Sequence, residues 1–157
     1  MKNLIKILII LILFTSCNKN SEEAQNLDTV SGTYKLTNVH TNIAVDLNSD
    51  GVFNTNLTKE SSCFNVTIIF KKEKSYISSS SMQSVSIYLP TNITCVPGNF
   101  STTGTWDDNA TNVFTIRTDG SSSTFIKESG NTLKFIFPVS TSPNPSQSIS
   151  YFIYTKQ

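Results

Sequence analysis

Apolar and polar side chains alternate along the chain from residue 31 onward. In residues 63–70, Phe64, Val66, Ile68 and Phe70 fall on one face, and mainly polar residues fall on the other. The same period of two returns at residues 34–36, 85–89, 113–117, 123–127, 133–137 and 149–153. A period of two is that of a β-strand with one buried face, so each segment predicts a strand.

Turn-forming residues separate the predicted strands. They occupy residues 48–51, 96–99, 107–109, 118–120, 129–131 and the longer segment 140–148. Asp119-Gly120 and Gly130-Asn131 suit tight hairpins, because Gly and Asn tolerate positive φ. No segment longer than a turn has a period of 3.6 residues, although residues 57–62 suggest a single helical turn.

The predicted architecture is therefore all-β. Successive hairpins without helical crossovers give an antiparallel meander of about eight or nine strands, and closing it into a small β-barrel removes the exposed sheet edges. Two sheets stacked as a β-sandwich are the alternative. Residues 31–157 suit one domain of this kind.

The N-terminus has the order of a secretory signal. The basic residues Lys2 and Lys6 come first, followed by an apolar run, the small pair Thr15-Ser16, and Cys17. The apolar run is too short to span a bilayer, which takes about 20 residues. The segment resembles a bacterial lipobox, and this resemblance implies that residues 1–16 are removed and that Cys17 becomes a lipidated N-terminus. A plain cleaved signal peptide with an incidental Cys17 is the alternative.

Residues 17–30 are polar and have no apolar period, which is typical of a flexible tether. The expected partner is thus a membrane, reached through acyl chains on Cys17. Asn18 stands where an inner-membrane retention signal would have Asp, so we expect the outer membrane. Glu22-Glu23 resembles the short acidic tags of some surface lipoproteins of Bacteroidetes, but a solvated linker is the favoured interpretation. The choice between the periplasmic and the cell-surface face stays open.

Composition agrees with strands and excludes one class of partner. Only 15% of the residues are charged, whereas Ser, Thr and Asn are abundant. Short polar side chains compete for backbone hydrogen bonds and disfavour long helices. From residue 17 onward the chain has ten basic and eleven acidic side chains. Without a basic patch, nucleic acid is not an expected partner.

Two cysteines remain in the predicted domain, Cys63 and Cys95. An exported chain folds in an oxidising compartment, so an even pair predicts a disulfide, and free thiols are the alternative. The bridge would close a loop of roughly 30 residues and contribute on the order of 3–4 kcal/mol. A metal site at the cysteines is not expected, because His40 is the only histidine and no C-x-x-C spacing occurs.

Several short motifs follow one another in an order that resembles a known family. They are residues 31–36 (Ser-Gly-Thr-Tyr-Lys-Leu), residues 45–51, Glu60 shortly before Cys63, Phe70, residues 104–106 (Gly-Thr-Trp), and the aromatic segment 151–154. This order resembles the lipocalin-like domains found in lipoproteins of Bacteroidetes, and it implies a small antiparallel barrel. Two positions differ from the family pattern: Tyr34 stands where Trp is usual, and no arginine lies near the last predicted strand.

One segment has the pattern of half a calcium loop. Asp46, Asn48 and Asp50 alternate as oxygen donors, and Gly51 permits a sharp turn. The position that requires a bidentate Glu is Leu57, so any Ca²⁺ affinity would be weak. We favour a plain hairpin turn shaped by Asn, Asp and Gly.

Four aromatic residues, Tyr34, Phe64, Phe100 and Trp106, have two interpretations. They could line an apolar ligand cavity, or they could fill the core of a small barrel, which is the more common outcome.

We expect no enzyme, because no Gly-x-Ser-x-Gly motif and no titratable cluster is visible. The leading hypothesis is a non-catalytic binding module for a small apolar or amphiphilic ligand. The alternative is a structural lipoprotein with a filled barrel whose loops contact a protein or glycan partner. A cavity inside the barrel discriminates between the two.

Overall fold

The computed structural model describes residues 30–88, 92–129, 131–136 and 149–157. These residues form nine β-strands: β1 (Gly32–Val45), β2 (Asn54–Asn56), β3 (Val66–Phe70), β4 (Ser75–Tyr88), β5 (Asn92–Asp108), β6 (Asn112–Arg117), β7 (Ser122–Glu128), β8 (Thr132–Ile136) and β9 (Ile149–Lys156). Within the described ranges, no helix is long and apolar enough to cross a membrane. The predicted signal sequence, the lipidation site Cys17 and all of the tether before Val30 lie outside these ranges.

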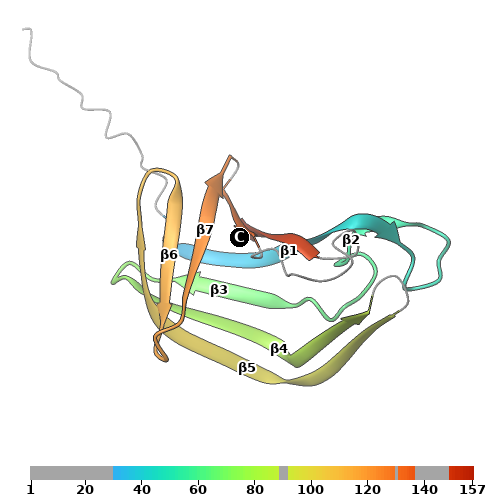
Figure 1. The fold of residues 1–157 in the computed structure, drawn as a ribbon. Coiled ribbons are helices and arrows are strands. Elements are labelled where there is room, and N and C mark those ends of the chain that lie inside the picture. Colours follow the sequence, from blue (N-terminus) through green and yellow to red (C-terminus); the bar gives the residue numbers. More distant parts are fainter. Residues whose placement is uncertain (1–29, 89–91, 130, 137–148) are drawn as a thin grey trace, which may run out of the picture.

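The strands form a closed antiparallel barrel (Figure 1). Each strand from β3 to β8 pairs with the next along the chain, and β1 joins β3 on one side and β9 on the other. Eight strands thus close the barrel, and the short β2 is an extra strand on β1. The predicted all-β barrel is confirmed, and the pairing of β1 with β9 excludes the β-sandwich alternative.

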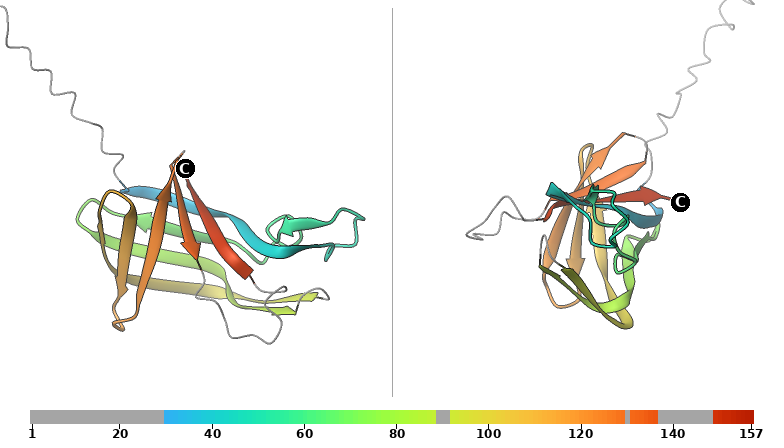
Figure 2. Two further views of the ribbon diagram at one scale, coloured as in Figure 1. Left: turned by 45° about the horizontal axis from the view of Figure 1, so that its top comes forward. Right: turned by 90° about the vertical axis from the view of Figure 1, so that its right-hand side faces the viewer.

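The long strands β4 and β5 continue beyond the barrel. β3 pairs with β4 as far as Ser80, and β6 pairs with β5 from Gly104 onward. From Met82 to Tyr88, the described partners of β4 all belong to β5, and the two strands leave the barrel as a two-stranded ribbon (Figure 2). The predicted turn at 96–99 is wrong. Pro97 lies within β5 opposite Met82, at a register shift, which is where a residue without an N–H is tolerated.

A disulfide fastens this ribbon to the body of the barrel. Cys63, in the loop before β3, is bonded to Cys95 of β5, and their Cα atoms are 5.5 Å apart. This confirms the predicted bridge. Cys63 is 1% exposed, so the bridge is anchored in the core on one side.

Phe70 lies at the centre of the core. Its ring contacts those of Tyr34, Tyr76, Trp106 and Phe125 at centroid distances of 5.5–6.3 Å. The five rings come from β1, β3, β4, β5 and β7, so one cluster ties most of the barrel together. Edge-to-face pairs of this kind add stability beyond the area that they bury. Val30, the first described residue, is buried with them.

Candidate functional site

A half-open cavity of about 280 Å³ lies among the strands of the barrel. Its apolar lining is Ile68, Phe125, Phe135 and Phe152. Its polar lining is Tyr76, Ser78, Thr102, Thr115, Arg117, Ser123 and Tyr154. Every strand from β3 to β9 contributes, so the cavity belongs to the closed barrel and not to a loop. The mixture of phenyl rings and hydroxyl groups makes it amphiphilic.

β6 contributes Thr115 and Arg117 to the lining of this cavity. Thr115 is 4% exposed, whereas Phe114 and Ile116 on the other face of the strand are 39% and 53% exposed. Strand residues alternate between two faces, so Arg117 continues the inward row of Val113 and Thr115. Thr115 and Arg117 thus add two polar side chains to the cavity lining, on the same face of β6 as the buried apolar Val113.

Among the described residues that line the cavity, Arg117 is the single charged one, and it is the only arginine in the sequence. Its backbone closes the β6–β7 turn: its N–H donates to the Ser121 carbonyl at 2.8 Å, and its carbonyl accepts from the Gly120 N–H at 3.0 Å. Among the described residues, none forms a hydrogen bond or an ion pair with its guanidinium. Hydrogen bonds from Ser121 lower the pKa of nearby Asp119, and the Arg117 charge lowers it to a smaller degree.

Tyr76 and Tyr154 bring two phenol groups to the lining. Gly104 lies between Tyr76 and Arg117 in the sheet. A Cβ at Gly104 would come within 2.8 Å of the Tyr76 ring, so the missing side chain makes room for that ring. Burial raises the pKa of Tyr154, which keeps its phenol neutral.

The four aromatic residues singled out in the sequence do not line this cavity. Trp106 and Tyr34 are 6% and 3% exposed and pack on Phe70 in the core. Phe64 is partly buried against the core, and Phe100 is 48% exposed. This cavity uses a different aromatic set, and Tyr34 and Trp106 lie in the core, as the favoured interpretation has it.

Tyr34 does border a second cavity, of about 280 Å³, beside Val30 and the β7–β8 turn. Its lining is mostly polar and includes Lys127 and Glu128. Lys156, on the last strand, lies over the Tyr34 ring with its Nζ 6.0 Å from the centroid. The amino group of Lys156 thus lies over the ring of Tyr34, the aromatic residue of the first strand.

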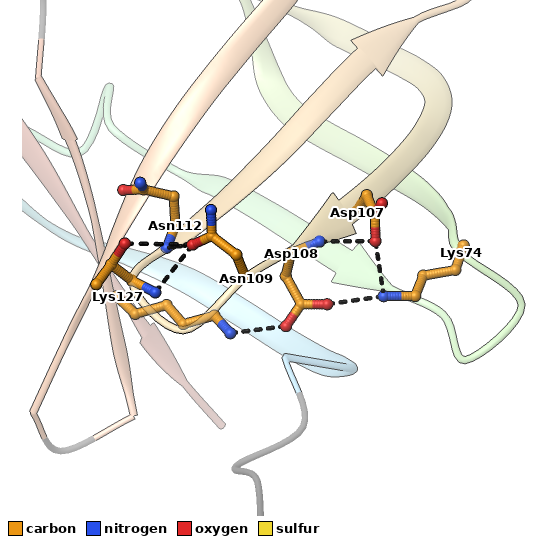
Figure 3. A network of polar contacts seen from close by, with 7 residues as sticks. Lys74, Asp107, Asp108, Asn109, Asn112 and Lys127 are labelled. Atoms are coloured by element: carbon orange, nitrogen blue, oxygen red, sulfur yellow. Dashed lines mark hydrogen bonds and ion pairs between the residues drawn. The ribbon is translucent and has the colours of Figure 1, made fainter.

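A network of charged side chains lies at the end of β5 (Figure 3). Asp108 accepts hydrogen bonds from Lys74 Nζ at 2.7 Å and from Lys127 Nζ at 2.6 Å, and so joins the β3–β4 turn to β7. Lys74 also lies 4.0 Å from the centroid of the Trp106 ring, whose Nε1 donates to the Lys71 carbonyl. In the register of β5 with β6, Asp108 is opposite Val113 and Gly104 is opposite Arg117. The network and Arg117 are therefore at opposite ends of that hairpin.

These contacts decide the charge state of Asp108. Partial burial raises its pKa, but the hydrogen bonds and charges of Lys127 and Lys74 outweigh this effect, so the pKa lies below its ordinary value. A carboxyl group whose pKa is lowered on folding contributes stability above its unfolded pKa and loses it as the pH falls through its folded pKa.

We expect Asp108→Asn to lower the free energy of unfolding at pH 7 by about 1–2 kcal/mol, a value reduced because Lys74 is half exposed. The difference from the wild type should shrink as the pH falls below about 4. Urea unfolding at pH 7, 5 and 3 measures both effects. Asp107→Asn is the matched control, since Asp107 is 83% exposed and should change stability little. A deficit in Asp108→Asn that is independent of pH contradicts the assignment.

The loop that suggested calcium is held by its own hydrogen bonds. Asp46 accepts from the backbone N–H groups of Asp50 and Gly51, and Asn48 Oδ1 accepts from that of Asp50. Asp50 in turn accepts from the Val52 N–H at 2.8 Å. These contacts are those of a turn, and they favour the hairpin interpretation.

Glu60 completes this loop from the buried side. It is 5% exposed and accepts hydrogen bonds from the Leu47 N–H at 2.8 Å and from the Asn54 side chain. In the described part of the chain, no group of three or more His, Cys, Asp or Glu residues is placed to hold a metal ion. Calcium binding by Asp46, Asn48 and Asp50 stays a prediction.

His40 lies away from the cavity lining. Its ring stacks on that of Tyr151, with centroids 4.4 Å apart. Arg117 and the inward hydroxyl groups are the residues that sequence reasoning missed. In residues 113–117 both rows contain apolar residues, and the strand could be oriented either way from the pattern alone.

Comparisons of this chain with protein-family models, with curated protein sequences and with solved structures find no match. The functional argument therefore depends on the residues and their geometry.

Proposed function

We propose that this protein is a non-catalytic binding module that holds a small amphiphilic molecule in the half-open cavity of its barrel. The observation that carries the proposal is the cavity of about 280 Å³, lined by strands β3 to β9. Burying an apolar ligand surface there contributes roughly 25 cal/mol per Å². The inward hydroxyl groups and phenols supply the few polar contacts that orient a ligand in such a pocket.

The size of the cavity limits the ligand. Ligand pockets usually measure about 300–1,000 Å³, so this cavity of about 280 Å³ lies just below the usual range. It has room for about nine groups of the size of a water molecule. A chain of about eight to ten carbons therefore fits the cavity, whereas a long-chain lipid would extend out of it.

Ligand binding is tested with a polarity-sensitive fluorescent fatty-acid probe titrated into the purified protein. We expect a saturable fluorescence increase for the wild type. Ser78→Phe, which places a ring in the cavity, should abolish that increase. The matched control is Ser79→Phe, on the exposed face of the same strand, which should bind the probe as the wild type does.

Two results would contradict the proposal. One is the absence of a saturable signal in the wild type. The other is equal binding by the wild type and Ser78→Phe. Thermal unfolding of both variants verifies that each is folded before titration.

The proposed location depends on residues outside the described ranges. The lipobox-like segment before Cys17 supports a lipid-anchored protein of the outer membrane, with the barrel held beside the membrane by the predicted tether. The order of motifs supports membership among the lipocalin-like lipoproteins. Mass spectrometry of the native product tests the anchor, and an unacylated Cys17 would contradict it.

A second function is favoured by one observation. Val52 and Phe53, in the loop between β1 and β2, are 57% and 68% exposed. Adjacent exposed apolar side chains on a loop suit contact with a partner surface. We therefore retain an interaction role through this loop as the second candidate function.

A further inference from the structure

The charge in the barrel cavity narrows the class of ligand. Among the described residues that line it, Arg117 is the only one with a charge, and it is positive. The guanidinium has no hydrogen-bonding or ion-pairing partner within the described part of the chain. The Arg117 charge lowers the pKa of Asp119, but the two side chains form no ion pair, so the guanidinium can still pair with an anionic ligand in the cavity.

We propose that the ligand is a medium-chain carboxylate whose head group is bound by Arg117. This inference rests on the proposed function and assigns the chemistry of its ligand. A guanidinium presents two parallel N–H groups in the plane that a carboxylate matches, so the pair is bidentate and oriented.

The placement of Arg117 suits a head group rather than a tail. Arg117 is the last residue of β6 and is exposed, so its charge remains in contact with solvent at the end of the strand. The aromatic lining, Phe125, Phe135 and Phe152, comes from β7 to β9. A carboxylate at Arg117 and an alkyl chain among the rings would place each part of one molecule beside its chemical complement.

Three other hydroxyl groups of the cavity lining differ in whether they already donate a hydrogen bond. Thr115 donates its hydroxyl to the Ser123 carbonyl at 3.3 Å and is therefore occupied. Ser78 and Thr102 come from β4 and β5, where they are paired with each other in the sheet. Both lie in the cavity lining and can donate a hydrogen bond to a carboxylate oxygen.

Octanoate and 1-octanol test this assignment, because they share a chain and differ in the charge of the head group. Isothermal titration calorimetry measures both on the wild type, on Arg117→Gln and on Lys35→Gln. Lys35→Gln is the matched control, since it removes one positive charge from an exposed position of β1. Octylammonium is a third ligand with the opposite charge.

We expect the wild type to bind octanoate about tenfold more tightly than 1-octanol, the lower end of the range for a hydrogen bond to a charged group, because Arg117 is exposed. Arg117→Gln should lose this preference while binding 1-octanol as before. Lys35→Gln should retain it. Octylammonium should bind the wild type less tightly than 1-octanol.

Failure of this inference is distinguishable from failure of the proposed function. If the wild type binds 1-octanol and octanoate equally, or if Arg117→Gln retains the preference, the inference is overturned and the binding module stands. If neither ligand nor the fluorescent probe binds, the proposed function itself fails. The comparison of the two ligands on the wild type needs no variant, so it decides the question even if Arg117→Gln is poorly folded.

Discussion

Phe70→Ala is expected to lower the free energy of unfolding by about 3–5 kcal/mol, the largest effect of any single substitution that we predict. Phe70 is 1% exposed, and its ring contacts four other aromatic rings from four different strands. Its removal leaves a cavity at the point where these strands meet, and a closed barrel cannot collapse readily to fill it. Thermal unfolding should show a midpoint lower by on the order of 15 °C.

Phe100→Ala is the matched control for this prediction. The same atoms are removed from a residue that is 48% exposed on β5, so the change in stability should be small. If both variants lose similar stability, the contribution of Phe70 does not come from its contacts in the core. Chemical unfolding with urea gives the two free energies, provided that the slope of each transition stays the same.

Much of the architecture could be predicted from the sequence, because strands with one buried face carry their period visibly. Residues 66–70 and 133–135 alternate, and they lie in the barrel strands β3 and β8. The β6–β7 hairpin follows the turn signal at Asp119-Gly120, where Gly120 has a φ of 85°. Two cysteines in a predicted exported chain indicated the disulfide correctly.

Two long strands were harder to predict. The serine-rich segment at 78–81 hides the first half of β4, because serine has no apolar face to display. Pro97 and Gly98 have the composition of a turn, although they lie within β5. In both cases, pairing with a neighbouring strand overrides the weak β-propensity of the segment. Such pairing cannot be seen in a single sequence.

The cavity was the least predictable feature. Tyr34 and Trp106 are aromatic and inward-facing, as a lining would be, but they fill the core around Phe70. The cavity is lined in part by the small side chains of Ser78, Thr102 and Thr115, and small side chains carry little signal by themselves. Its position is a consequence of which strands lie opposite each other in the closed barrel.

Reduction of the Cys63–Cys95 disulfide is expected to lower the free energy of unfolding by roughly 3–4 kcal/mol, because the two residues are 32 positions apart and the bridge restricts a loop of that length in the unfolded chain. The effect should be uneven along the chain. A two-stranded ribbon is marginal by itself, so the part of β5 beyond the barrel should lose hydrogen-exchange protection first. Residues 102–108, which pair inside the barrel, should keep theirs until global unfolding.

Reduction tests the bridge without creating a cavity, which matters because Cys63 is buried. Urea unfolding of the wild type with and without reductant gives the difference directly. The double variant Cys63→Ala/Cys95→Ala should unfold at a lower urea concentration than the oxidised wild type and should not respond to reductant. A wild type whose unfolding midpoint is the same in both conditions contradicts the prediction. Local loss of protection confined to the ribbon would show that the bridge stabilises the extension of the barrel, so that octanoate binding at Arg117 should survive reduction under native conditions.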